Sequence, residues 1–336
     1  MTAVEAIGKR AKPRRPLYLA SPGDTLALTE EAENLLDGHW PASPSALLAL
    51  ADAKRRDLAT MLLYRACHRG GNGAFLERAA RLPGGLAPVA TPIRLLIVPG
   101  FLFAEHPELA LDGTLICGVA ERLGVEAEVL PIESRGISAT NAKHLAERLS
   151  GPFDRPTWLI TISKGTSDAR AAMQLLGGWP RALSGWLDLS GIFSGTPIAD
   201  WWTEETVKRW LMRALFGAVN LPFGTLLEMR RDAAIWRDPV VPPARERLIH
   251  VLGFPPPDRV EPRMVRNYRR LYLEHGPNDG FTPLTTAFDY PGRLFPVWGA
   301  DHLMRLPDVS GLVYRLIHLA AAVEAGLIPP TGKVDR

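Results

Sequence analysis

Ser163 lies where the chain is predicted to turn sharply from a strand into a helix. The apolar run Trp158-Leu-Ile-Thr-Ile162 predicts a buried strand, and the alanine-rich segment after Gly165 predicts a helix. A serine on such a turn is exposed on a strained elbow, and a glycine two residues later lets the helix pass close to the sheet. The free N–H groups and the dipole at the start of the helix can stabilise a negative charge developing on oxygen. The pattern therefore indicates a nucleophilic serine.

The other residue types that could do chemistry give no metal or nucleotide signature. Six histidines have no carboxylate or histidine at metal-ligand spacing: His39, His68, His106, His144, His250 and His318. Cys67 and Cys117 are too few for a disulfide framework or a zinc site. No glycine-rich phosphate-binding motif occurs in the sequence. We therefore expect no metal, no cofactor, and a reducing, cytoplasmic environment.

Strand and helix patterns alternate from Pro92 onward, and these elements must position the serine. Apolar or alternating runs predict strands at 95–98, 125–130, 158–162, 186–189, 248–252 and 294–298. Helical patterns occur at 113–123, 138–149 and from 309 to 325. Such alternation is typical of right-handed crossovers in a parallel sheet that is covered on both faces. We therefore predict an α/β fold with a doubly wound, mostly parallel sheet.

Three parts of the chain differ in character. Residues 1–24 contain five Lys or Arg within positions 9–15 and no long apolar stretch, so we predict a disordered, basic tail, with weak attraction to anionic surfaces as the alternative. Residues 25–90 have helical patterns without a nucleophile and a base together, which predicts a helical N-terminal flank. Residues 91–330 are expected to form the α/β domain, with a helical insertion at about 198–243.

Charge and hydropathy exclude other classes of partner. Lys plus Arg exceed Asp plus Glu by only three, 39 against 36, which is too small an excess to indicate a nucleic-acid partner. No run approaches the roughly 18 apolar residues of a membrane span, because Glu324 interrupts the best candidate. We interpret one basic helical stripe as a solvated face, with a phosphate-bearing lipid or nucleotide as the alternative; it consists of Arg263, Arg266, Arg269 and Arg270.

Four segments resemble motifs of the α/β-hydrolase superfamily, and within it those of lipase-like and esterase-like members. Thr161-Ile-Ser-Lys-Gly165 matches the Gly-x-Ser-x-Gly elbow except at its first position. Leu189-Ser-Gly-Ile-Phe-Ser-Gly-Thr-Pro-Ile-Ala-Asp200 is similar to the segment that leads into the lid of many lipases. Pro277-Asn-Asp-Gly-Phe-Thr-Pro283 resembles the acid-bearing turn, and Gly299-Ala-Asp-His302 resembles the histidine loop. The resemblance covers residues 92 to 325.

The resemblance implies a catalytic triad. Ser163, Asp279 and His302 have the nucleophile, acid and histidine order of the superfamily. His302 would then take the Ser163 proton, Asp279 would orient the imidazole, and Ser163 would form an acyl-enzyme that water resolves. Asp188, on an earlier predicted strand, is the alternative acid, whereas Asp301 is expected to hydrogen-bond within its own loop.

An oxyanion hole is implied at two loops. Its donors would be the backbone N–H of Lys164 and that of Phe101, which lies in the loop after the first strand. Pro99 stands where lipases usually have a histidine, and Leu102 is both the alternative donor and a candidate substrate contact. Two interpretations of the Lys164 side chain are open: an ion pair with Asp168 one helical turn later, or a contact to an acidic substrate.

The insertion at about 198–243 is rich in Trp and Phe. Trp210, Leu211 and Leu215 have helical spacing and predict one apolar helix face. That face could pack on the sheet as ordinary core. Alternatively, since an insertion at this point lies over the carboxyl ends of the strands, it could form an apolar roof over the acyl site. The second interpretation predicts that Trp201 or Trp202 lines the site and that the roof can open.

Together these features predict a serine hydrolase that cleaves carboxylic esters with an apolar acyl group, acting on a small-molecule or lipid-like ester. An acyltransferase that uses the same acyl-enzyme is one alternative. A catalytically inactive, hydrolase-like binding protein is another, and the departures at Pro99 and Thr161 are the features that favour it.

Overall fold

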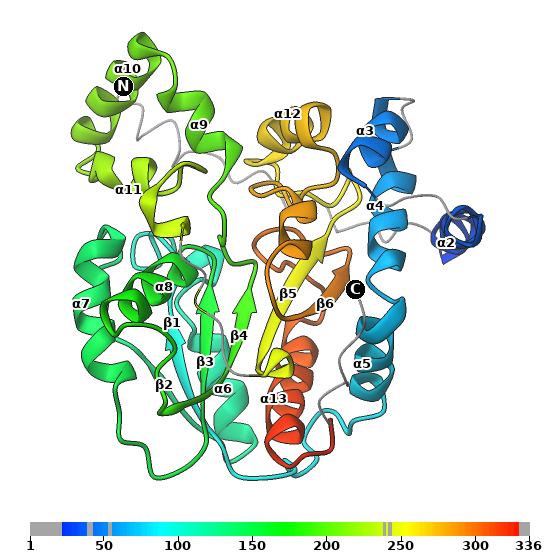
Figure 1. Ribbon diagram of the computed structural model, residues 1–336, viewed down its shortest axis with the longest axis vertical. Coiled ribbons are helices and arrows are strands. Elements are labelled where there is room, and N and C mark those ends of the chain that lie inside the picture. Colours follow the sequence, from blue (N-terminus) through cyan, green and yellow to red (C-terminus); the bar gives the residue numbers. More distant parts are fainter. Residues whose placement is uncertain (1–21, 39–42, 53–55, 238–239, 241–243, 329–336) are drawn as a thin grey trace.

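Six strands form one sheet in which every neighbouring pair is parallel, in the order β2-β1-β3-β4-β5-β6 (Figure 1). The computed structural model describes residues 22–38, 43–52, 56–237, 240 and 244–328. The strands are β1 (Arg94–Val98), β2 (Glu126–Val129), β3 (Thr157–Ile162), β4 (Leu183–Leu189), β5 (Leu248–Phe254) and β6 (Arg293–Trp298). All six predicted strands are confirmed, and their carboxyl ends share the upper edge of the sheet in Figure 1.

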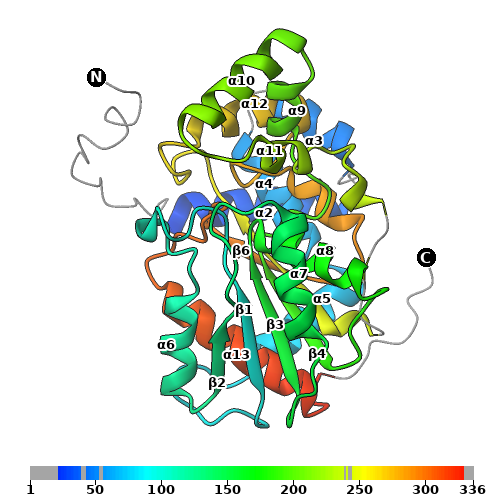
Figure 2. The same cartoon turned by 90° about the vertical axis from the view of Figure 1, so that its left-hand side faces the viewer.

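Helices cover both faces of the sheet (Figures 1 and 2). They are α7 (Ser138–Leu149) and α8 (Gly165–Leu175) on one face, and α6 (Thr114–Arg122) and α13 (Val309–Glu324) on the other. Side chains along each strand alternate between the two cores: Leu96 and Leu159 pack toward α7 and α8, whereas Leu95 and Ile160 pack toward α6 and α13. Because both faces are buried, the strands read as continuous apolar runs, and this made them recognisable in the sequence.

Four helices precede the sheet in the described part of the chain: α2 (Pro22–Asp37), α3 (Pro44–Asp52), α4 (Arg56–Ala66) and α5 (Gly70–Ala80). Leu47 and Leu62 from this group share a core with Phe254 of β5 and Tyr272 of α12 (Val265–His275). The helical character predicted for residues 25–90 is confirmed for these four elements, while the division into domains stays a prediction. Of the predicted tail, residues 1–21 lie outside the described residues, and α2 already begins at Pro22.

The insertion between β4 and β5 contains α9 (Pro197–Thr203), α10 (Thr206–Ala218) and α11 (Phe223–Glu228), and it lies above the carboxyl edge of the sheet (Figure 1). Thr196 caps α9 by accepting a hydrogen bond from Ile198 N (3.2 Å), and its hydroxyl donates to Phe281 O (2.6 Å). The inner side of the insertion is an apolar cluster that includes Phe216 and Leu226 and reaches Phe281. The insertion is thus tied to the loop that carries Asp279.

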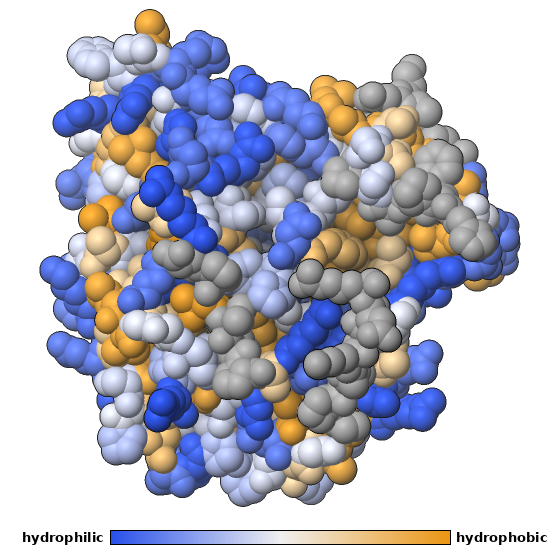
Figure 3. All heavy atoms as spheres, in the orientation of Figure 1, coloured by the Kyte–Doolittle hydropathy of each residue, from blue (hydrophilic) through white to orange (hydrophobic). Residues whose placement is uncertain are grey.

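The apolar face predicted for α10 points to solvent. The side chains of Trp210, Leu211 and Leu215 are 72%, 58% and 47% exposed, and orange spheres lie over α10 at the upper left of Figure 3. Met212 and Phe216, on the other side of the helix, make the contacts with the rest of the insertion. The alternative in which Trp210, Leu211 and Leu215 pack on the sheet as core is therefore wrong, and the roof over the acyl site stays a prediction. The reason is that α10 has two apolar sides, and the sequence pattern singled out the one with more large residues.

None of the helices in the described ranges is long and apolar enough to cross a membrane.

Candidate active site

Ser163 occupies a strained turn between β3 and α8. Its backbone has a φ of +51°, in the left-handed region that a residue with a Cβ seldom adopts, and its N–H donates to Leu189 O (3.0 Å). Gly165 explains how the chain turns so tightly. A Cβ at this position would lie 2.5 Å from Pro99 O and 2.6 Å from Val98 O, so only glycine lets α8 start this close to β1.

Thr161 stands where the elbow motif usually has glycine, and a buried polar network accommodates it. Its hydroxyl lies 2.8 Å from Thr166 Oγ1, and it accepts a hydrogen bond from Trp186 Nε1 (2.8 Å). Asp188 accepts from the Thr166 hydroxyl (2.5 Å) and from that of Thr161 (3.3 Å). The carboxylate of Asp188 thus joins the strand before Ser163 to the helix after it. Sequence reasoning missed this network, although Thr161 and Asp188 had each been singled out.

One continuous line of hydrogen bonds joins three of the predicted site residues. Ser163 Oγ lies 2.8 Å from His302 Nε2, and His302 Nδ1 lies 2.8 Å from Asp279 Oδ2. An ionised carboxylate can only accept, so Nδ1 carries the proton and Nε2 is left to accept from the serine hydroxyl. The three residues come from loops at the ends of β3, α12 and β6, which the parallel sheet brings to the same edge.

Asp279 is buried and its carboxylate is fully hydrogen-bonded. Oδ1 accepts from Phe281 N (2.8 Å) and Thr282 N (2.7 Å), while Oδ2 accepts from Thr282 Oγ1 (3.1 Å) as well as from His302. Burial by itself would raise the pKa of Asp279, but the charge of His302 and these hydrogen bonds outweigh burial and lower it. Thr282 belongs to the Pro277–Pro283 motif, yet nothing in the sequence indicated its role.

The same pairing acts on His302 in the opposite direction. Burial alone would lower the pKa of His302, but the Asp279 carboxylate outweighs burial and raises it. The next residue back, Asp301, accepts from Leu303 N (3.0 Å) and from Glu261 N (2.9 Å), so it fixes the loop on which His302 lies. Burial raises the pKa of Asp301 to about 6. Asp301 thus has the hydrogen-bonding role in its loop that was expected from the sequence.

The two backbone amides predicted to form the oxyanion hole are open. Among the described residues, neither Phe101 N nor Lys164 N donates a hydrogen bond. Leu102 N, the alternative donor, is engaged by Ser134 O (3.0 Å), which favours Phe101. The Lys164 side chain forms a buried ion pair with Asp168, which also accepts from Asn141 Nδ2 (2.8 Å). Of the two interpretations of the Lys164 side chain, the structure contains the ion pair with Asp168.

Asp188, the alternative acid, is in a different position. It is fully buried, and its remaining oxygen lies 3.3 Å from His250 Nδ1. No hydrogen bond between Asp188 and His302 occurs in the described part of the chain, whereas Asp279 makes one. The geometry therefore favours Asp279 as the partner of His302.

Comparisons with known proteins bear on the fold. No family model matches the chain, and no curated protein matches it significantly. Among solved structures, 107 chains match. The metagenomic carboxyl esterase MGS0156 superposes with a TM-score of 0.52 at 21% identity, over 73% of this chain and 78% of that one. This chain has the α/β-hydrolase fold.

Two further matches are the Bacillus licheniformis lipase BlEst2 in mature form and a hydrolase of the α/β superfamily from Xanthomonas campestris. The first matches at 13% identity with a TM-score of 0.46, over 71% of this chain and 93% of that one. The second matches at 16% identity with a TM-score of 0.35, over 70% of this chain and 99% of that one.

The two tryptophans predicted to line the site make no ring contact with His302 among the described residues, although Phe281 contacts the cluster of Trp201, so their place in the site stays a prediction. Trp201 packs with Ile198 and Leu271, donates to Glu274 Oε2 (2.7 Å) and lies under the Arg270 guanidinium, 3.8 Å from its carbon. Arg270, part of the stripe expected to be solvated, thus covers an aromatic ring. Trp202 is more than one-third exposed.

Phe281 lies against the imidazole of His302, and sequence reasoning missed it. The centroid of its ring lies 4.8 Å from that of His302. Phe281 also contacts the apolar cluster of the insertion, so that cluster continues down to the imidazole. In the described ranges, no group of three or more His, Cys, Asp or Glu residues could hold a metal ion.

Proposed function

We propose that this protein is a serine hydrolase that cleaves carboxylic esters with an apolar acyl group. The observation that carries the proposal is the hydrogen-bonded line from Ser163 Oγ through His302 to Asp279, with the open amides of Phe101 and Lys164 beside it. The apolar cluster of the insertion, which reaches His302 through Phe281, supports an apolar acyl group.

The proposed reaction has two halves. Ser163 Oγ attacks the ester carbonyl carbon while its proton passes to His302 Nε2, and the carbonyl oxygen becomes an oxyanion that the Phe101 and Lys164 amides stabilise. When the oxyanion collapses, the C–O bond to the alcohol breaks and the alcohol takes the proton from His302. Water then repeats the sequence on the acyl-enzyme, and His302 returns the proton to Ser163 as the carboxylic acid leaves.

The test is labelling and turnover with a matched serine control. A fluorophosphonate probe should label wild type and the Ser190→Ala variant but not Ser163→Ala, and p-nitrophenyl esters should be hydrolysed in the same pattern. Ser190 is a close control, because it also has a positive φ (+49°), follows a strand and precedes a glycine, but its Oγ has no hydrogen-bond partner among the described residues. Labelling without hydrolysis of any ester would favour acyl transfer. Equal labelling of Ser163→Ala would rule the proposal out.

The insertion is expected to set chain-length preference through its inner side. Replacing Phe216 with alanine should lower kcat/KM for p-nitrophenyl octanoate more than for p-nitrophenyl acetate, because Phe216 lies in the cluster that contacts Phe281. Replacing the exposed Trp210 should leave the ratio of the two rates unchanged. Thermal unfolding of both variants serves as the folding check. A change in the ratio with Trp210→Ala alone would assign the acyl contact to the outer face instead.

A further inference from the structure

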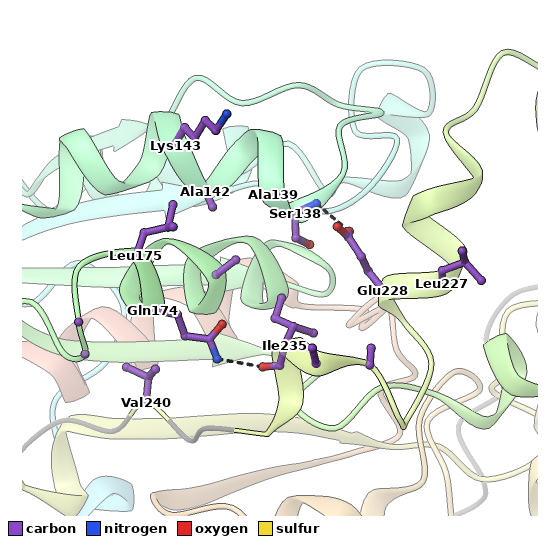
Figure 4. Close-up of a pocket in the computed structure, with 15 residues that line it drawn as sticks. Ser138, Ala139, Ala142, Lys143, Gln174, Leu175, Leu227, Glu228, Ile235 and Val240 are labelled. Carbon is purple, nitrogen blue, oxygen red and sulfur yellow. Dashed lines mark hydrogen bonds between the residues drawn. The ribbon is translucent and has the colours of Figure 1, made fainter.

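A cavity that Ser163 does not border lies between α7, α8 and the segment that follows α11. We call it the α7–α8 groove; its volume is about 1000 Å³, and none of the three residues in the hydrogen-bonded line borders it. Its walls are largely apolar, with Ala139 and Ala142 from α7, Leu175 from α8 and Ile235 opposite them (Figure 4). A volume and a lining of this kind are typical of small-molecule sites.

One end of the groove is polar (Figure 4). The Ser138 side chain is buried there, and its Oγ has no hydrogen-bond partner among the described residues. Glu228 of α11 approaches the same point, and its Oε2 accepts a hydrogen bond from Ser138 N (2.7 Å). A buried hydroxyl without a partner is unfavourable, so a ligand that bonds to it would gain free energy in addition to apolar contacts.

The charge at this end selects the ligand. The start of α7 carries the equivalent of roughly half a positive charge, which is less than the full negative charge of the Glu228 carboxylate. The net field is therefore negative, and it favours a cation over an anion. Lys143, the other charged residue that borders the groove, lies on the upper side of α7 in Figure 4, whereas Glu228 lies below the start of that helix.

We propose that the α7–α8 groove binds an apolar chain that ends in a primary ammonium group. The ammonium would donate to Glu228 and to Ser138 Oγ, and the chain would lie along Ala139, Ala142 and Ile235. Because Glu228 belongs to the insertion and Ser138 to α7, this ligand would bridge the insertion and the body of the protein. The proposal does not depend on the reaction at Ser163.

The test is calorimetric titration of the full chain with octylammonium, octanol and octanoate. Octylammonium should bind with a stoichiometry of one and more tightly than octanol, and octanoate should bind weakest. Glu228→Gln should raise the Kd of octylammonium about tenfold or more, while it keeps an oxygen that can accept the hydrogen bond from Ser138 N. Ala139→Trp should abolish binding by filling the groove, and because Ala139 is exposed this change leaves the core intact.

Lys143→Met is the matched control on the same groove, and it should bind octylammonium as wild type does. Stronger binding of octanoate than of octylammonium, with its loss in Lys143→Met, would overturn the proposal in favour of an anion site. If octylammonium still binds to Ala139→Trp, the ligand lies elsewhere and the proposal is wrong. The proposal is also wrong if octylammonium does not bind to wild type. If Glu228→Gln fails to fold, the comparison of the three ligands and the Ala139→Trp variant still test whether the groove binds an alkylammonium ion.

Discussion

Ser163→Ala and His302→Ala should each reduce kcat/KM for an ester by about a million-fold, and the double variant should be scarcely worse than either single one. The reason is that the two residues act as a unit. The serine hydroxyl is a poor nucleophile unless Nε2 takes its proton, and the imidazole has no task once the hydroxyl is gone. Their 2.8 Å contact is what makes the losses overlap.

The measurement is a double-mutant cycle on one p-nitrophenyl ester, with active-site titration to exclude contaminating wild type. The activity that remains should come from the two open amides and from binding alone. Ser190→Ala again serves as the control with full activity. Losses that simply multiply in the double variant would contradict a shared mechanism and would assign Ser163 and His302 to independent roles.

Asp279→Asn should lower kcat by about ten-thousand-fold, because an amide can hold the imidazole in the wrong tautomer, with the proton on the nitrogen that faces Ser163. The pH profile should change as well. His302 must be neutral to accept a proton, so in wild type kcat/KM should fall as the pH drops through the raised pKa of His302. Without the Asp279 charge that pKa should fall, and the acid limb of the residual activity should move to lower pH.

Asp188→Asn is the comparison for this prediction. Its expected effect is smaller, because Asp188 acts on the turn through Thr161 and Thr166 and makes no hydrogen bond to His302 in the described residues. The acid limb of kcat/KM should stay close to that of wild type. If Asp188→Asn were the more damaging change and Asp279→Asn were mild, the acid would be Asp188.

The sheet and the hydrogen-bonded line could be anticipated because each rests on a local pattern. Strands buried on both faces leave uninterrupted apolar runs, and Ser163, Asp279 and His302 each lie in a short loop motif at the end of an element. The order of elements along the chain then brings those loops to one edge of the sheet. No long-range contact had to be known beforehand.

The contacts of the insertion could not be anticipated, because hydrophobic periodicity does not say which of two apolar sides faces inward. On α10 the side with Trp210 faces solvent and the side with Phe216 faces Phe281. The same limit applies to Thr161. Its hydroxyl contacts side chains on α8 and β4, and only the three-dimensional fold brings those side chains next to it. The α7–α8 groove is likewise a property of packing between three segments.

The exposure of α10 also bears on where this molecule opens first. None of its thirteen residues is buried, so its amides are held by helical hydrogen bonds and by the partial burial of Met212 and Phe216. Local unfolding of such an element exposes little new apolar surface, and its free energy lies far below that of unfolding the sheet. We therefore expect the amide hydrogens of α10 to exchange with solvent before those of β3 or β4, which hydrogen-exchange mass spectrometry would show.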